Sequence, residues 1–194
     1  MVTILIPYAT SEGQTARVVD RIAERLRDAG HTVELERVER VPTDVSVADY
    51  DAVIVACSIH AGNHQPAIVA FAKRQREALS TRPSGFVQLS LSAASDEPDR
   101  QGEAAGYVES FFAETGWRAD LIGNFAGAIR YSEYNFLLRF VMKRIAKSST
   151  GDTDTARDYE YTDWAAVEAF ADDFAALVAD RVPADDSPTV SPER

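Results

Sequence analysis

The stretch Pro7-Tyr8-Ala9-Thr10-Ser11-Glu12-Gly13-Gln14-Thr15 decides how the rest of the 194-residue chain is interpreted. It joins an apolar run, Val2 to Ile6, to a helical pattern that starts at Ala16. A strand, a loop of small hydroxyl residues and a helix start direct backbone N–H groups and the positive end of a helix dipole at one point. The stretch therefore predicts a phosphate-binding loop after the first strand.

The donors of this loop are neutral. Thr10, Ser11 and Thr15 can donate hydroxyl hydrogen bonds, and Gly13 allows a turn that a side chain would block. The loop lacks the glycine spacing and the Lys of nucleotide triphosphatases, and it lacks the three glycines of the dinucleotide fingerprint. It fits a phosphate monoester; the alternative is an ordinary strand-to-helix turn capped by Ser11 or Thr10.

Composition indicates one acidic domain. The chain has 31 Asp and Glu against 20 Lys and Arg, a net charge of −11, and only three of its basic residues are Lys. This charge repels nucleic acid and anionic membranes in general. An acidic surface with few Lys also fits a protein that works in concentrated salt, although an acidic protein from a low-salt environment fits as well.

The sequence also suggests a compartment. Cys57 is the only Cys and follows an apolar run, which predicts a buried thiol rather than a disulfide. No apolar run reaches about 18 residues, and the first residues have a strand pattern rather than that of a signal sequence. We expect a cytoplasmic protein without a metal site.

Strand and helix patterns alternate along the chain, which predicts a three-layer, doubly wound α/β fold around a five-stranded parallel sheet of order 2-1-3-4-5. The alternation of apolar and charged residues from Thr32 to Arg37 predicts an edge strand. We assign residues 1–182 to this one domain. Strand patterns cover 2–6, 32–37, 51–56, 85–91 and 121–128, and helical spacing covers 16–29, 67–79, 103–115 and 164–182.

In such a sheet, ligands bind beyond the carboxyl ends of the strands, where the strand order reverses. This point collects Thr10 to Thr15, the loop Ser58 to His64 and, beside them, Ser92 to Asp96. The Ser58 to His64 loop has Gly62 and few bulky side chains, so its amides could approach a flat heterocycle. A polar surface loop with two histidines is an equally weighted interpretation.

A long insertion, residues 130–155, contains the only basic island of the chain. Residues 130–147 have five basic residues and one acid, which leaves a charge of −15 for the rest. Their spacing predicts a basic amphipathic helix, which could bind an anionic membrane or a carboxylate ligand, or simply pack over the site. Residues 183–194 are predicted to be a disordered acidic tail.

Five motifs together carry a family resemblance. Thr10 to Thr15 resembles the FMN-phosphate loop of flavodoxins. The whole set resembles the flavodoxin-like, quinone-dependent protoporphyrinogen IX dehydrogenase family, from the first strand to about Leu177. The other four motifs are Ser58-Ile59 with Gly62, Gly127-Ala128-Ile129-Arg130-Tyr131, Gly151-Asp152-Thr153-Asp154-Thr155 and Tyr161-Thr162-Asp163-Trp164.

The resemblance implies a flavodoxin-like fold, an FMN cofactor and oxidation of protoporphyrinogen IX to protoporphyrin IX with a quinone acceptor, in haem biosynthesis. The flavin would carry the chemistry, with His60 and His64 as candidate proton shuttles. Arg139, Lys143, Arg144 and Lys147 would contact the substrate or a membrane. The residues implied to hold FMN are Thr10, Ser11, Glu12, Gly13, Gln14, Thr15, Ser58, Ile59, His60, Gly62, Ser92, Ala93, Gly127 and Tyr131.

The strand-end loops lack Tyr and Trp, so Tyr131 or Tyr134 is the candidate for stacking on the flavin.

Other functions stay open. A flavodoxin-type electron carrier is the main alternative, and a module that binds a phosphorylated ligand without redox chemistry is another. A carrier favours an exposed flavin edge surrounded by acidic residues, whereas a basic segment near the flavin favours an anionic substrate or a membrane.

Overall fold

A computed structural model of the chain describes residues 1–39, 45–95, 97–129 and 159–182. Its strands are β1 (Thr3–Tyr8), β2 (Thr32–Arg37), β3 (Ala52–His60), β4 (Asn63–His64), β5 (Ser84–Ser90), β6 (Leu121–Ala126), β7 (Ala128–Ile129) and β8 (Tyr159–Glu160). Its helices are α1 (Gln14–Asp28), α2 (Pro66–Arg74), α3 (Arg76–Ser80), α4 (Pro98–Thr115) and α6 (Trp164–Arg181), with short 3₁₀ turns η1 (Val47–Asp49) and η2 (Ser92–Ala94).

Five parallel strands form the main sheet in the order β2-β1-β3-β5-β6, and the short β4 pairs antiparallel with β3. Without β4 this is the predicted order 2-1-3-4-5, and β2 is the expected edge strand. Tyr8 pairs with Ala56 and Ser90 pairs with Ala126. The carboxyl ends of β1, β3, β5 and β6 therefore meet at one edge of the sheet.

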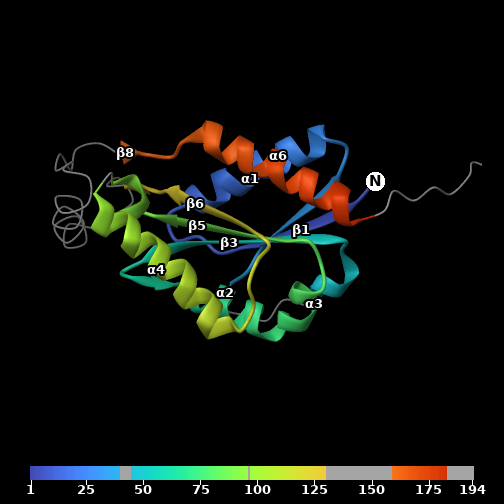
Figure 1. Cartoon of the computed structure of the whole chain (residues 1–194), viewed down its shortest axis with the longest axis horizontal. Coiled ribbons are helices and arrows are strands. Elements are labelled where there is room, and N and C mark those ends of the chain that lie inside the picture. Colours follow the sequence, from blue (N-terminus) through green and yellow to red (C-terminus); the bar gives the residue numbers. More distant parts are fainter. Residues whose placement is uncertain (40–44, 96, 130–158, 183–194) are drawn as a thin grey trace, which may run out of the picture.

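Helices cover both faces of the sheet, as the doubly wound prediction requires. Figure 1 shows α1 and α6 over one face and α2, α3 and α4 over the other. Phe170 and Phe174 of α6 belong to the first core, and Phe86, Phe111 and Trp117 belong to the second. Each face thus has its own apolar layer, because side chains alternate between the two faces along each strand.

Three local predictions were wrong. The helix expected over 67–79 is two helices, because it breaks at Gln75, whose side chain bonds the backbone of Val45 and Val47. Helix α4 begins at Pro98 rather than Glu103, since proline suits the first turn of a helix. Strand β3 runs on to His60, so part of the expected Ser58 to His64 loop is a β-hairpin with β4.

The residues that flank segment 130–158 lie side by side, because β7 pairs with β8. The predicted insertion, residues 130–155, and the predicted tail, residues 183–194, lie outside the described residues. Among the residues that are described, none of the helices has the length and apolar character needed to cross a membrane. Cys57 is buried as predicted, and burial raises the pKa of its thiol.

Candidate functional site

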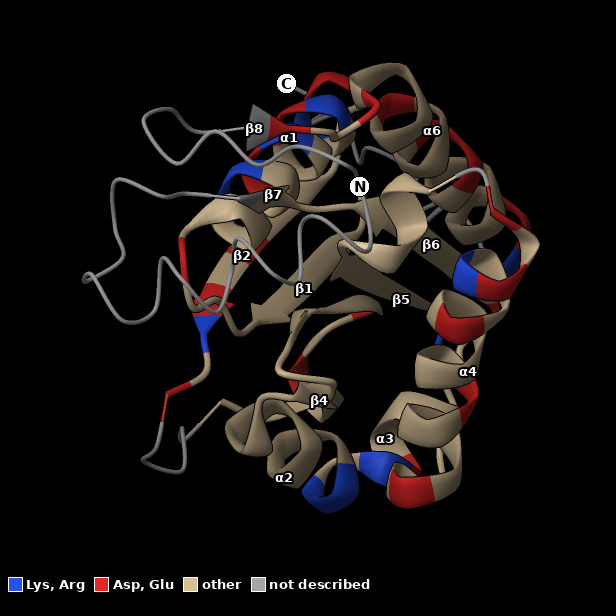
Figure 2. Ribbon diagram, turned by 90° about the vertical axis from the view of Figure 1, so that its left-hand side faces the viewer, with Lys and Arg blue, Asp and Glu red and all other residues tan. Residues whose placement is uncertain are grey.

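A cleft of about 330 Å³ opens at the carboxyl edge of the sheet, the edge that faces the viewer in Figure 2. Its walls come from the loop after β1, the turn between β3 and β4, the segment after β5, the first turns of α4 and the end of β6. The cleft volume is in the range of small-molecule sites. It lies at the predicted reversal of strand order, between β1 and β3.

The loop after β1 forms a cradle around the start of α1. Gly13 has a φ of 82°, a left-handed conformation that favours glycine, and its N–H donates to Thr10 Oγ1 at 3.0 Å. Helix α1 begins at Gln14, two residues before the predicted start, and no side chain caps it. An α-helix leaves its first N–H groups without partners inside the helix, so this end can bind an anion.

Thr15 is the most informative residue of the cradle. Its side chain lines the cleft and is 1% exposed, yet its hydroxyl has no hydrogen-bond partner in the described part of the protein. An unpaired buried hydroxyl destabilises a fold by about 1–3 kcal/mol. A hydroxyl in this state, at the start of a helix that no side chain caps, indicates a ligand with acceptor atoms.

Gln65 links the cradle to β3, and it was not among the residues predicted for the site. Its Nε2 donates to Ser58 Oγ at 2.8 Å and to Ser11 Oγ at 3.3 Å, while its Oε1 accepts from the Ser58 N–H. The Ser58 amide is therefore engaged within the protein rather than available to a ring. Each hydroxyl oxygen uses an acceptor position in these bonds, and its O–H donor remains.

Gln14 was predicted to hold FMN, but its side chain bonds protein groups. Its Nε2 donates to Thr162 Oγ1 at 2.9 Å, and Thr162 donates to the carbonyl of Ala126, also at 2.9 Å. Arg17 donates to Gln14 Oε1 at 3.3 Å. We call Gln14, Thr162 and Ala126 the clasp. It fastens the start of α1 to the end of β6 and to the chain that returns after β8.

The β3–β4 turn brings His60 to the cleft. Ala61 and Gly62 both have positive φ, which lets two residues reverse the chain. His60 Nδ1 lies 4.0 Å from Glu12 Oε1, and the two side chains are 49% and 18% exposed. His60 therefore lines the cleft beside a carboxylate, with about half of its side chain open to solvent.

His64 does not line the cleft, which corrects its expected place beside His60. Its Nε2 lies 2.9 Å from Gln88 Oε1, and its ring contacts the edge of Phe111. Because Gln88 Nε2 donates to two carbonyl-type oxygens, Gln88 Oε1 accepts and His64 Nε2 carries the proton. Burial lowers the pKa of His64, so it is neutral and structural at neutral pH.

The segment after β5 is fixed by a carboxylate on α4. Glu103 accepts from Ser92 Oγ at 2.7 Å, Tyr107 Oη at 2.9 Å and Arg100 Nη1 at 3.0 Å. We call these four residues the Glu103 cluster. The bond from Ser92, with those from Tyr107 and Arg100, lowers the pKa of Glu103. Tyr107 was predicted only as a helix residue, yet it places an aromatic side chain in the cleft.

Comparison with known proteins agrees with this architecture. A family model described as a flavodoxin domain matches residues 5–156. The chain belongs to the flavodoxin domain family. It is 35% identical over 174 residues to protoporphyrinogen IX dehydrogenase (quinone) of Leishmania major, which covers 89% of this chain and 74% of that protein. The Escherichia coli K12 protein of the same name is 34% identical over 173 residues, covering 89% and 94%.

Solved flavodoxins share the fold. Oxidised flavodoxin 1 from Bacillus cereus has a TM-score of 0.55 at 14% identity, covering 93% of this chain and 99% of that one. A short-chain flavodoxin associated with a bacterial microcompartment has a TM-score of 0.56 at 13% identity, covering 92% and 100%. Identities this low show the fold alone, and they confirm the flavodoxin-like prediction.

The cleft of this flavodoxin-family chain collects most of the residues implied to hold FMN. Gly13 and Ala93 do not line it. Gly13 forms the turn of the cradle through its positive φ, and the Ala93 N–H donates to Ser90 Oγ. Tyr131 lies outside the described residues, as do Arg139, Lys143, Arg144 and Lys147. The implied residues that line the cleft are Thr10, Ser11, Glu12, Gln14, Thr15, Ser58, Ile59, His60, Gly62, Ser92 and Gly127.

Proposed function

We propose that the chain is an FMN-dependent oxidoreductase that oxidises protoporphyrinogen IX to protoporphyrin IX with a quinone as acceptor. The names of its relatives in Leishmania major and Escherichia coli support the substrate and the acceptor. The observation that carries the cofactor is the buried Thr15 hydroxyl without a partner. A phosphate at the start of α1 would accept from it and remove the cost of burying it unpaired.

The donors of the cradle suit a phosphate without a basic residue. Thr10 Oγ1 accepts from the Gly13 N–H, and Ser11 Oγ accepts from Gln65, so both hydroxyls keep their O–H donors. The dipole of α1 adds positive potential at the same point. These residues fit the phosphate of FMN, which when bound supplies the hydride and electron transfer that protein side chains lack.

The remaining residues of the cleft would orient the ring and move protons. Gly62 has no side chain to occupy the cleft at the β3–β4 turn, and Tyr107 of α4 supplies an aromatic side chain. His60 can accept and release a proton at Nδ1, next to Glu12. We propose that His60 carries protons between the cleft and the solvent.

The segment after β7 would bring in the substrate or the acceptor. Residues 130–147 contain the basic island, and the chain enters this segment from β7, which pairs with β8 next to the cleft-lining Gly127 and Ala128. We propose a cytoplasmic protein whose residues Arg139, Lys143, Arg144 and Lys147 contact an anionic substrate or an anionic membrane surface.

Anaerobic turnover tests this function. The protein loaded with FMN is mixed with protoporphyrinogen IX and a soluble quinone, and the fluorescence of protoporphyrin is followed. We expect porphyrin to form only when protein, FMN and quinone are all present, with FMN-free protein as the control. If FMN binds and is reduced by an electron-transfer partner while no porphyrin forms, the protein is an electron carrier, as the acidic Glu12 and Glu103 at the cleft would favour.

A further inference from the structure

The Glu103 cluster fixes an arginine at the cleft. Arg100 donates to Glu103 Oε2 at 3.0 Å, and only about a quarter of its side chain is exposed, 27%. Glu103 is held in turn by Ser92 of η2 and by Tyr107, which lies one turn further along α4. Three donors on one carboxylate leave it little freedom to move. The guanidinium bonded to it is therefore positioned before any ligand arrives.

Arg100 is also unusual in its charge. Among the described residues that line the cleft, it is the only Lys or Arg, in a chain whose net charge is −11. Helix α4 begins two residues earlier, at Pro98, so the positive end of its dipole lies on the same rim. The cradle follows β1 and η2 follows β5, with β3 between these strands, so Arg100 stands apart from the phosphate position.

Tyr107 closes the cluster against the opposite wall. A Cβ added to Gly62 would lie 3.7 Å from Tyr107 Oη, so the hydroxyl packs over the glycine turn between β3 and β4. Burial, and then the bond to Glu103, raise the pKa of Tyr107 above 10.0. Tyr107 is therefore a neutral donor that holds Glu103 in place while its ring stays in the cleft.

We propose that Arg100, positioned by Glu103 and Tyr107, binds a carboxylate of the substrate at the end of the cleft away from the cradle. A guanidinium carries N–H donors in a planar fork that matches a carboxylate, and Arg100 Nη1 donates to Glu103. In the proposed function the neutral donors of the cradle hold the cofactor phosphate, so a second anion in the cleft would meet Arg100, the one Lys or Arg among the described lining residues. The inference rests on the proposed function, because protoporphyrinogen IX is the ligand that carries propionate groups.

The experiment compares a porphyrin acid with its ester. Protoporphyrin IX and its dimethyl ester are titrated into the FMN-loaded protein, and binding is measured by fluorescence without turnover. The parent should bind the acid more tightly than the ester. Arg100→Gln should weaken binding of the acid by about tenfold or more and leave the ester unchanged, because a hydrogen-bonded ion pair is lost only with the acid. Arg100→Lys keeps the charge and should retain part of the preference.

Arg118→Gln is the matched control. It removes the same charge from the segment that follows α4, where Arg118 pairs with Glu109 outside the cleft. This variant should bind both porphyrins as the parent does. Thermal melts of all variants check that Arg100→Gln is folded. If that variant does not fold, the comparison of acid and ester in Arg100→Lys decides.

Two results would overturn the inference. The first is an unchanged preference for the acid in both Arg100 variants. The second is a loss of FMN affinity with an unchanged preference, which would assign Arg100 to the cofactor. Failure of the proposed function has a different signature, because the parent itself would then form no porphyrin from protoporphyrinogen IX in the turnover assay.

Discussion

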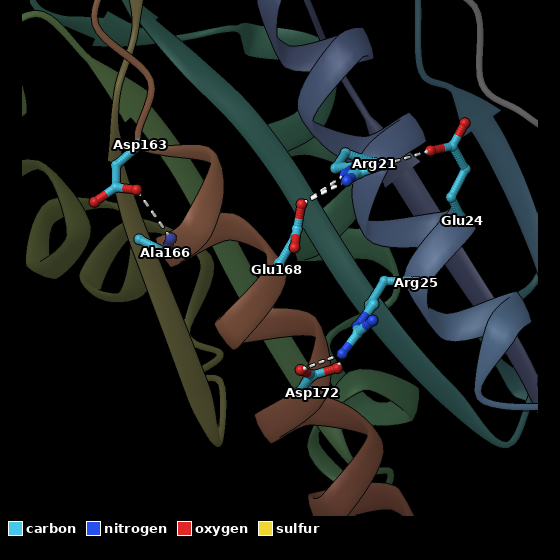
Figure 3. A network of polar contacts seen from close by, with 7 residues as sticks. All are labelled: Arg21, Glu24, Arg25, Asp163, Ala166, Glu168 and Asp172. Carbon is cyan, nitrogen blue, oxygen red and sulfur yellow. Dashed lines mark hydrogen bonds and ion pairs between the residues drawn. The ribbon is translucent and has the colours of Figure 1, made fainter.

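The first turn and the later turns of helix α1 differ in whether their polar side chains have partners. Along its later turns, Arg21 pairs with Glu168 at 2.6 Å and Arg25 pairs with Asp172 at 2.7 Å, so both arginines are joined to α6 (Figure 3). At its first turn, the Thr15 hydroxyl is buried without a partner. Two exposed arginines of this helix are therefore paired within the protein, whereas its buried Thr15 hydroxyl is not.

The difference separates structure from function. The ion pairs between α1 and α6 lie in solvent, where such pairs contribute little and tolerate change. Beneath them the apolar core of α6 and the sheet supplies the stability. The buried unpaired hydroxyl at the first turn has no such role in stability, and its place at the cleft is what motivates the proposed ligand.

The largest effect should come from the core under the ion pairs. Phe174 is fully buried between α6 and the sheet, beside Phe170. Phe174→Ala should lower the free energy of unfolding by about 3–5 kcal/mol, because it leaves a cavity in a packed layer. Urea unfolding measures this, and a loss below about 1 kcal/mol would show that the α6 side is not the main source of stability.

The next largest effect should appear at the other end of α1 and in a different measurement. Thr15→Val keeps the shape and removes the hydroxyl. We expect FMN affinity to fall by about tenfold to a hundredfold, because a hydrogen bond to a charged group contributes about 1.5–3 kcal/mol. The FMN-free variant should be at least as stable as the parent, since no hydrogen bond is lost.

Thr115→Val is the matched control for that substitution. Thr115 is also buried, but its hydroxyl donates to the Phe111 carbonyl at 2.8 Å on α4. Its loss should lower stability and leave FMN affinity unchanged, the reverse of Thr15→Val. Calorimetric titration with FMN and urea unfolding separate the two results. Equal behaviour of the two variants would remove Thr15 from the cofactor site.

The bounds of a strand or helix could be predicted from the sequence where one local signal, such as the alternation of an edge strand, determined them. The alternation in Thr32 to Arg37 gave the bounds of β2 because one face of an edge strand is exposed. The bounds of α4 were missed because small and acidic residues precede Glu103, although Pro98 is a recognised signal of a helix start. The hairpin of β4 was missed because two residues give no periodicity.

The candidate site was predictable only in part, for a different reason. Hydroxyl residues next to a glycine predict a phosphate loop within one short stretch, so the cradle at Thr10 to Thr15 could be located at the cleft from the sequence. Gln65 and Glu103 act through side chains that meet partners from other elements. No spacing in the sequence reports such contacts. Gln14 lines the cleft, as its motif position predicted, and the bond from its side-chain amide to Thr162 is a further contact that no spacing reports.

The clasp predicts a smaller effect that couples both regions. Thr162→Val removes the bonds to Gln14 and to the Ala126 carbonyl. Each should contribute about 1 kcal/mol, so stability should fall modestly, and FMN affinity should fall less than in Thr15→Val because the cradle loses only its support. A double-mutant cycle with Gln14→Leu measures the coupling. Additive effects of the two substitutions would contradict the clasp.

The smallest effect should come from one exposed ion pair, and it should depend on pH. The hydrogen bond from Arg25 lowers the pKa of Asp172 below 3.8, its ordinary value. A carboxyl whose pKa is lowered by folding adds stability above its unfolded pKa, and this stability is lost as pH falls through the folded pKa. The double variant Arg25→Gln with Asp172→Asn removes the pair and keeps the net charge. Its stability deficit should be constant near neutral pH and disappear in acid.

Phe174→Ala is the control for this pH dependence, because its loss of unfolding free energy should not change as Asp172 titrates. No ionisable group is changed in that variant, so its cost should stay the same when urea unfolding is repeated from pH 7 down to about pH 3. If the deficit of the ion-pair variant is equally constant, the pair between Arg25 and Asp172 acts through packing of the arginine stem rather than through charge. A deficit that disappears in acid would confirm that the attraction between Arg25 and Asp172 stabilises the packing of α1 on α6. The first turn of α1 differs, because there the buried Thr15 hydroxyl has no partner.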